Sequence, residues 1–173
     1  MPQHSERMLG FQLWLNLPRA EKMAEPAYLS IGPGQIGLER REGAEVRVLS
    51  GRFGGAEGVT PHHIPASIYD ISLRPGASLE IPVDPEETAF LFLIEGEALV
   101  EGRRIGEKTA ALLEKGEAVV VAAPEEKPAR VIFYSGRPLH EPIAWGGPIV
   151  MNTDAELSHA FAELRAGTFI KHK

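Results

Sequence analysis

The chain has 173 residues, no cysteine and a formal net charge of −6 at pH 7. Its length suits one domain with a sizeable core, and 43% hydrophobic with 24% charged residues is the composition of a water-soluble protein. The negative balance argues against direct nucleic-acid binding, and the lack of cysteine excludes disulfides and thiolate metal sites. The apolar stretch at residues 11–17 is too short to cross a membrane, so we expect a cytoplasmic protein with no membrane partner.

The first expected element is a strand at residues 11–17, where apolar residues alternate with Gln12 and Asn16. Pro18 ends this strand because proline cannot donate a backbone hydrogen bond. Residues 18–26 then have the character of a linker. A single strand that precedes the main body of the chain needs a sheet to pair with. We expect this partner sheet to lie outside the main body.

From Ala27 onward the pattern is one of short strands separated by glycine-containing turns. Clear alternation or short apolar runs predict strands at residues 45–49, 67–73, 78–81, 109–113, 118–121 and 131–134. Strands of this length at near-regular spacing predict an antiparallel sandwich or barrel.

The centre of this barrel is expected at residues 89–100. An unbroken apolar run at 90–94 predicts a strand that is covered on both faces. The triplet Glu95-Gly96-Glu97 then predicts a tight turn, after which residues 98–100 resume as a second strand.

Near the end of the chain, the spacing of apolar residues changes from that of a strand to that of a helix. Thr153 and Glu156 have the spacing of a capping box, in which each side chain accepts a hydrogen bond from the other residue's backbone N–H. Apolar residues follow at helical spacing, and Gly167 stands where a C-terminal cap is expected. We expect this amphipathic helix to pack on the outside of the sheet, over residues 90–94.

Several long strings of this sequence resemble the pirin family. They are Gly-Phe-Gln-Leu-Trp-Leu-Asn-Leu-Pro at residues 10–18, Arg-Pro-Leu-His-Glu-Pro at 137–142 and Gly-Pro-Ile-Val-Met-Asn-Thr at 147–153. The resemblance runs from Met1 to Phe169. Pirins are bicupins, with two facing jelly-roll barrels and one metal, usually iron, in the N-terminal barrel.

The resemblance implies an all-β fold: a cupin-type double-stranded β-helix, or jelly-roll barrel, with a C-terminal amphipathic α-helix. It divides the chain into the last strand of an N-terminal cupin plus linker (1–26), the pirin C-terminal cupin (27–150), and the helix and tail (151–173). The partner that it implies is the N-terminal cupin half, or another copy of the chain.

In the family, a His-x-His pair and a later His-x-Glu pair hold the Fe(II). His4 and Glu6 have the form of the second pair, which makes them alternative metal ligands, but their position relative to Met1-Pro2 favours solvated linker residues. In the second barrel, the cupin pattern places Pro82 and Asp84 where a His-x-His pair would lie. We therefore expect no cofactor in this chain and no catalytic residue.

The resemblance leaves two functions open. The chain is expected to act as a metal-free structural or binding module that completes a bicupin. The alternative is the activity described for whole pirins, either an iron-dependent quercetin 2,3-dioxygenase or a transcriptional cofactor. Gln12, Trp14 and Asn16 are the candidate pocket-lining residues, and a flavonol is the kind of small aromatic ligand expected there.

Overall fold

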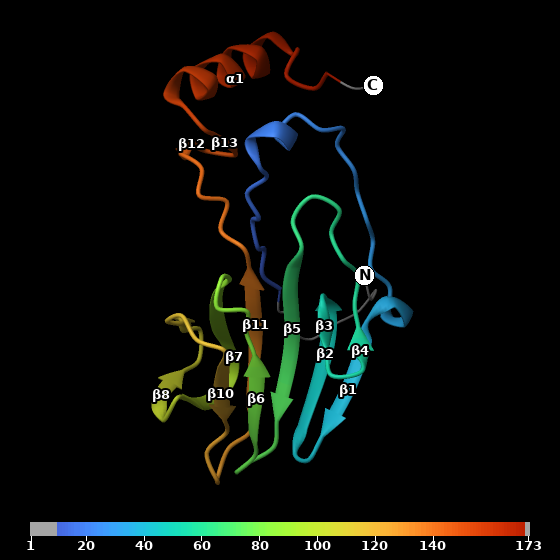
Figure 1. Cartoon of the computed structure of the whole chain (residues 1–173), viewed down its shortest axis with the longest axis vertical. Coiled ribbons are helices and arrows are strands. Elements are labelled where there is room, and N and C mark those ends of the chain that lie inside the picture. The colour runs from blue at the N-terminus through green and yellow to red at the C-terminus, as the bar shows by residue number, and fades with distance from the viewer. Residues whose placement is uncertain (1–9, 172–173) are drawn as a thin grey trace. The chain divides into compact units, whose positions relative to one another are not determined.

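The computed structural model describes residues 10–171, whose contacts divide into two compact units. One unit runs from Glu25 to His140 and contains the barrel strands. The other joins residues 10–24 to residues 141–171, so segments from the N-terminal and C-terminal parts of the chain fold together. Figure 1 labels α1 and strands of both units. Among the described residues, no helix is both long enough and apolar enough to cross a membrane.

The first unit, which we call the barrel unit, is built from eleven strands and one short 3-10 helix. These elements are η2 (Pro33–Gln35), β1 (Gly37–Arg41), β2 (Ala44–Ser50), β3 (Arg52–Phe53), β4 (Ala56–Glu57), β5 (Ala66–Leu73), β6 (Ser78–Pro82), β7 (Thr88–Val100), β8 (Arg103–Gly106), β9 (Ala110–Leu112), β10 (Ala118–Ala122) and β11 (Ala129–Gly136).

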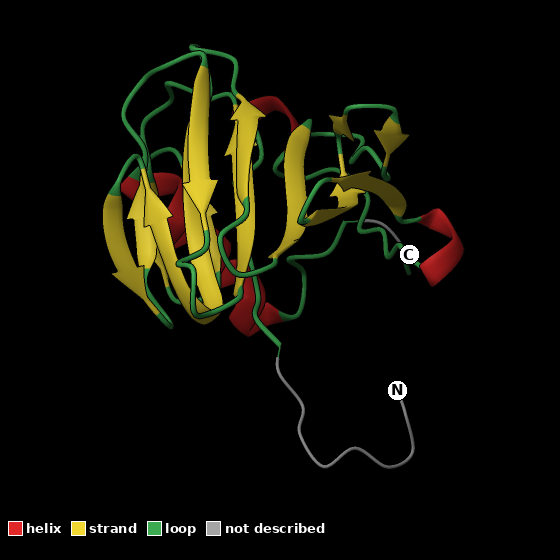
Figure 2. Cartoon of the chain, turned by 90° about the horizontal axis from the view of Figure 1, so that it is seen from below, coloured by secondary structure: helices red, strands yellow, loops and turns green. Residues whose placement is uncertain are grey.

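Nine of these strands form one sheet in the order β1-β2-β5-β11-β7-β10-β6, with β8 and β9 also paired to β7. Every pairing is antiparallel, and β11 lies between β5 and β7 (Figure 1). Figure 2 shows strands of the chain, in yellow, lying side by side. Alternation places one set of side chains inside, as in β2, where Val46 and Val48 are fully buried and Arg47 is exposed. The predicted barrel strands are therefore confirmed.

The predicted turn at residues 95–97 is wrong. β7 continues unbroken from Thr88 to Val100, and it passes through Gly96 with φ +83°. Its pairing with β11 shifts register between Arg130 and Val131, which marks a β-bulge. Glycine tolerates the left-handed conformation that a bulge needs, so the strand bends and changes partner from β11 to β8 without reversing.

The centre of the sheet is buried on both faces, as the apolar run predicted. Val131 and Phe133 of β11 point into the barrel and are fully buried, while Ile132 and Tyr134 on the opposite face are exposed by only 2% and 5%. Tyr134 stacks on Phe90 of β7, with ring centroids 4.5 Å apart. This second apolar face requires cover outside the barrel.

The second unit, which we call the terminal unit, holds η1 (Arg19–Glu21), β12 (Ala144–Gly146), β13 (Ile149–Met151) and α1 (Asp154–Ala166). Residues 10–18, which include the strand expected at residues 11–17, form neither a helix nor a paired strand, so this strand stays a prediction. An alternating sequence becomes a strand only when a neighbouring backbone pairs with it. No strand among residues 10–171 pairs with this segment.

Both predicted caps of α1 are confirmed. The Thr153 hydroxyl accepts a hydrogen bond from the Glu156 N–H, and the Glu156 carboxylate accepts one from the Thr153 N–H. Gly167 ends the helix in the left-handed conformation, with φ +71°.

The predicted packing surface of α1 is corrected. Leu157, Ala160 and Phe161 pack on the β12–β13 hairpin within the terminal unit, where Ile149 and Met151 are buried. The helix therefore finds its apolar contacts on this hairpin, rather than on the strand at residues 90–94.

Candidate functional site

The interior of the barrel unit is a packed apolar core. Its largest fully buried side chains are all hydrophobic: Phe133, Ile71, Leu73, Ile81, Leu91, Leu93, Val46, Val48, Val121 and Val131. Tyr69 stacks on Phe133 at a centroid distance of 5.3 Å, and its hydroxyl donates to the Arg52 carbonyl at 2.7 Å. Close packing of this kind leaves the interior without the polar ligands that a metal needs.

Pro82 and Asp84, which lie where a cupin His-x-His pair is expected, do not form a metal site. Asp84 is exposed and accepts hydrogen bonds from the Glu86 N–H at 2.9 Å and from Arg137 Nη2 at 3.0 Å. The backbone hydrogen bond from Glu86, followed by the contact with Arg137, holds the pKa of Asp84 below its ordinary value. Asp84 is thus an ionised surface carboxylate that fixes a turn.

The residues that the structure describes do not fit an iron centre. Among residues 10–171, no three histidine or carboxylate side chains come together closely enough to share an ion. His62 and His63 are exposed in the loop between β4 and β5. His4 and Glu6, the alternative ligands, lie outside the described residues, so their role stays a prediction.

The terminal unit contains an open apolar pocket of about 490 Å³, which we call the tryptophan pocket. It is lined by Trp14, Leu15, Asn16, Leu17, Lys22, Ile143, Trp145, Pro148, Ile149, Val150, Met151 and Phe169. Trp14 and Asn16, two of the three candidate residues, thus lie together in its wall, whereas Gln12 does not line it. Whether the pocket holds a ligand stays a prediction.

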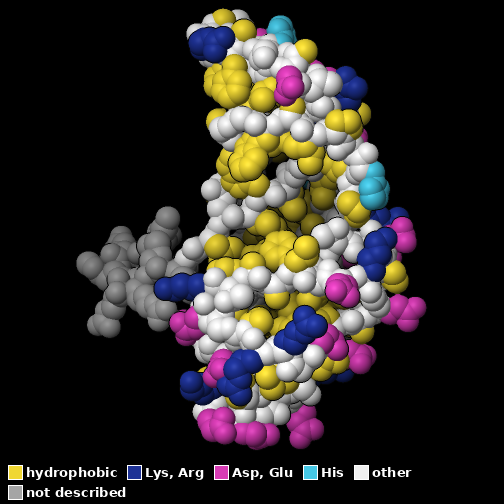
Figure 3. Space-filling model, turned by 90° about the vertical axis from the view of Figure 1, so that its left-hand side faces the viewer, with side chains coloured by type: hydrophobic (Ala, Val, Ile, Leu, Met, Phe, Trp, Pro, Cys, Tyr) yellow, Lys and Arg dark blue, Asp and Glu magenta, His cyan; other side chains and the backbone are white. Residues whose placement is uncertain are grey.

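Two tryptophans give this pocket its chemical character. Trp14 is 55% exposed and Trp145 is 71% exposed. On the face of the molecule drawn in Figure 3, hydrophobic side chains, in yellow, reach the surface in several places. The Trp145 indole N–H donates to the Gly147 carbonyl at 2.8 Å, which orients its ring. Flat apolar walls of this kind suit a planar aromatic molecule.

Two polar groups complete the wall of the tryptophan pocket. Lys22 Nζ donates to the Asn16 side-chain oxygen at 2.5 Å. Burial lowers the pKa of Lys22, although the negative charges of Glu141 and Glu156 oppose this shift. A partly desolvated ammonium beside aromatic walls can pair with an anionic oxygen of a ligand.

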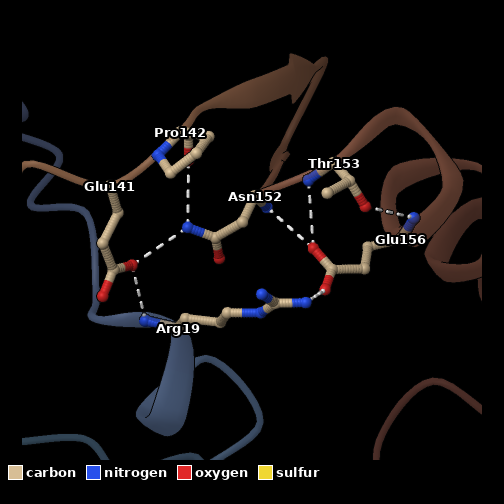
Figure 4. A network of polar contacts seen from close by, with 6 residues as sticks. All are labelled: Arg19, Glu141, Pro142, Asn152, Thr153 and Glu156. Atoms are coloured by element: carbon tan, nitrogen blue, oxygen red, sulfur yellow. Dashed lines mark hydrogen bonds and ion pairs between the residues drawn. The ribbon is translucent and has the colours of Figure 1, made fainter.

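The two chain ends are joined by a polar network, drawn in Figure 4. The Arg19 N–H donates to Glu141 Oε2 at 2.8 Å, and Arg19 Nη2 donates to Glu156 Oε1 at 2.5 Å. Asn152 donates through Nδ2 to the same Glu141 oxygen and to the Pro142 carbonyl, each at 2.9 Å. The N-terminal segment is therefore anchored to the C-terminal region by charge-assisted hydrogen bonds.

The sequence reasoning missed Lys22 and Trp145 as pocket residues. One signal could have found Trp145: the chain has only two tryptophans, and each is close to a proline, Trp14 to Pro18 and Trp145 to Pro148. Large exposed aromatic side chains in such places favour a binding surface.

The sequence pattern of the pirin C-terminal cupin domain matches residues 68–170. The chain belongs to the pirin family. It is 36% identical to a pirin-like protein of Caulobacter vibrioides, across 98% of this chain and 62% of that protein. It is 32% identical to human pirin, across 95% of this chain and 58% of that protein. The chain thus spans about three fifths of the length of these pirin relatives.

A solved structure supports the same assignment. The crystal structure of quercetin 2,3-dioxygenase from Acinetobacter baumannii superposes with a TM-score of 0.82 at 31% identity, covering 90% of this chain and 55% of that one. This match confirms the cupin-type β fold with one C-terminal helix. The chain is therefore similar both to pirins and to a quercetin 2,3-dioxygenase, and this similarity shows its family.

Proposed function

We propose that this chain supplies the C-terminal cupin of a two-cupin pirin, with its barrel unit acting as an apolar scaffold. The observation that carries the proposal is the barrel interior, where the ten largest fully buried side chains are all hydrophobic. Asp84, the one ionisable residue at an expected ligand position, is occupied by Arg137 and by the Glu86 backbone. On this proposal, the metal of the family lies outside the barrel of this chain.

The partner in this proposal is an N-terminal cupin, or another copy of the chain where no such cupin is present. Trp14 and Leu15 support it, because they are 55% and 42% exposed on a segment whose sequence alternates like a strand. A neighbouring strand would bury these side chains and pair the backbone. The length of the relatives also supports a further portion, since this chain spans about three fifths of them.

A second candidate function is the oxidation of a flavonol, in the manner that the name of the Acinetobacter baumannii protein indicates. The tryptophan pocket favours it, because Trp14 and Trp145 offer flat apolar walls and Lys22 offers a positive charge to an ionised hydroxyl. The described residues do not fit the metal that such a reaction uses, so His4 and Glu6 would have to contribute to it.

Quercetin consumption by the purified chain distinguishes the two functions. The assay is run on the chain alone and on a fusion in which the N-terminal part of the Caulobacter relative precedes it. The scaffold proposal predicts consumption by the fusion and none by the chain alone. Turnover by the chain alone, lost on His4→Gln and Glu6→Gln substitution, would support the second function and contradict the first.

A further inference from the structure

A second pocket of about 330 Å³ lies in the terminal unit, and we call it the asparagine pocket. Asn152 lines it together with the cations Arg19, Lys22 and Lys171, the carboxylates Glu156 and Glu163, His159, and the apolar side chains of Met23, Met151 and Ala160. Neither the family assignment nor the proposed scaffold role assigns a function to this pocket. Its polar groups nevertheless indicate which chemistry it can bind.

Asn152 presents a buried hydrogen-bond acceptor that has no partner among the described residues. Only 5% of the residue is exposed, and its Oδ1 makes no hydrogen bond. Its Nδ2 donates to the Glu141 carboxylate and to the Pro142 carbonyl, and because both are acceptors the amide orientation is fixed. In Figure 4 the oxygen points toward the Arg19 side chain. A buried acceptor without a hydrogen bond destabilises the folded protein, so a ligand group that donates to Asn152 Oδ1 would be stabilising.

Lys22 supplies a positive charge that no carboxylate neutralises directly. Its ammonium group donates to the neutral side-chain oxygen of Asn16, and no ion pair joins it to an acid in the part of the chain that the structure describes. The two glutamates that line the pocket are engaged elsewhere: Glu156 with Arg19, and Glu163 with Lys171 and His159. An anion placed beside Lys22 would therefore gain a direct ion pair.

We propose that the asparagine pocket binds a small carboxylic acid that carries a hydroxyl group. The carboxylate pairs with Lys22, and the hydroxyl donates to Asn152 Oδ1. The hydrocarbon or aromatic body of the ligand lies on Met23 and Met151, whose sulfur atoms make favourable contacts with rings. A water molecule could satisfy Asn152, but it would leave the charge of Lys22 unpaired, so the two occupants differ in what they predict.

The test uses the whole chain and three matched probes. These are 2-hydroxybenzoate, 4-hydroxybenzoate and benzoate, titrated by calorimetry at low salt, with amide shifts followed by NMR. We expect at least one hydroxybenzoate to bind about tenfold or more tighter than benzoate, because only the hydroxyl compounds supply the donor that Asn152 lacks. The shift changes are expected at Asn152 and Ala160.

Two pairs of variants test the binding, and the second pair assigns it to this pocket, because Lys22 lines the tryptophan pocket as well. Lys22→Met is compared with Lys115→Met, which removes a lysine of the barrel unit, and only Lys22→Met is expected to weaken hydroxybenzoate binding. His159→Trp is compared with Ser158→Trp. Both are exposed helix positions, but only His159 lines the pocket, so the His159→Trp indole is expected to obstruct the ligand. This second pair keeps the test decisive if Lys22→Met perturbs folding.

Four outcomes would overturn the proposal. They are no binding of any probe, equal affinity for benzoate and the hydroxybenzoates, shift changes confined to Trp145, and unchanged affinity in the His159→Trp variant. None of these outcomes bears on the scaffold role of the barrel unit, because every group in the asparagine pocket belongs to the terminal unit.

Discussion

A Cβ atom placed on Gly96 would lie 2.0 Å from the carbonyl oxygen of Pro128. The backbone of Gly96 is also left-handed, with φ +83°. Any side chain at this position would therefore meet both a conformational penalty and a backbone clash. Only glycine therefore fits this close approach between β7 and the residue that precedes β11.

Gly96→Ala is expected to destabilise the barrel unit by about 3 kcal/mol or more, because the neighbouring backbone would have to shift. Gly102→Ala is the matched control. Gly102 has φ +74° but nothing within 4 Å of its added Cβ, so only the conformational cost of about 1 kcal/mol is expected. Denaturant unfolding of both variants measures the difference. Equal losses would mean that the contact with Pro128 is unimportant.

The pair Asp70–Arg130 is expected to stabilise the interface between β5 and β11. Arg130 donates to the two Asp70 carboxylate oxygens through Nε at 2.9 Å and Nη2 at 2.7 Å, a bidentate geometry. A double-mutant cycle with Asp70→Asn and Arg130→Met should give a coupling of about 1 kcal/mol, discounted because Arg130 is partly exposed. The more exposed pair Arg104–Glu97 should couple less strongly. The reverse order would contradict this account.

The helix cap should stabilise the terminal unit. Thr153→Ala removes the hydroxyl that accepts the Glu156 N–H, and a loss of about 1 kcal/mol is expected. Ser158→Ala, at an exposed position within the same helix, should be neutral or slightly stabilising. Hydrogen exchange of the α1 amides reports both changes. Equal protection in the two variants would show that the cap contributes nothing.

Acid should weaken the terminal unit through Glu156. Burial tends to raise the pKa of this carboxyl, but hydrogen bonds from Arg19, Asn152 and Thr153 outweigh burial and lower it below its ordinary value of 4.5. A lowered pKa in the folded state means that the stabilisation is present above pH 4.5 and is lost as pH falls through the folded value.

Tryptophan fluorescence can follow this loss, because Trp14 and Trp145 both belong to the terminal unit and are the only two tryptophans in the chain. We expect a change below pH 4.5 that Glu156→Gln diminishes. Glu57→Gln, which removes a surface ion pair of the barrel unit, should leave the profile unaltered. An identical acid profile in wild type and Glu156→Gln would refute the assignment.

Self-association tests the proposal that a partner cupin or another copy of the chain buries the N-terminal segment. Trp14 and Leu15 remain exposed, so the chain alone should dimerise or aggregate, and Trp14→Ser with Leu15→Ser should shift it toward monomer. Light scattering across a concentration series measures this. A clean wild-type monomer whose residues 11–17 are protected from hydrogen exchange would count against the proposal.

Alternation and capping were sufficient to predict the barrel strands and both ends of α1. The triplet at residues 95–97 predicts a turn that the structure does not have, because a glycine with positive φ suits a bulge as well as a turn, and only pairing with β11 and β8 decides between them. The segment at 11–17 alternates like a strand, but pairing depends on a partner that its own sequence does not reveal. The tryptophan pocket joins the two ends of the chain, so no local pattern could bring Trp14 and Trp145 together.

We propose that the barrel of this chain is an apolar scaffold and not a metal site. The most direct test is to load the purified chain with excess Fe(II), remove free metal and measure the iron that remains by elemental analysis. The account predicts far less than stoichiometric iron, because the described residues offer no cluster of ligands. A tightly held, stoichiometric iron that persists in His4→Gln and Glu6→Gln variants would contradict it.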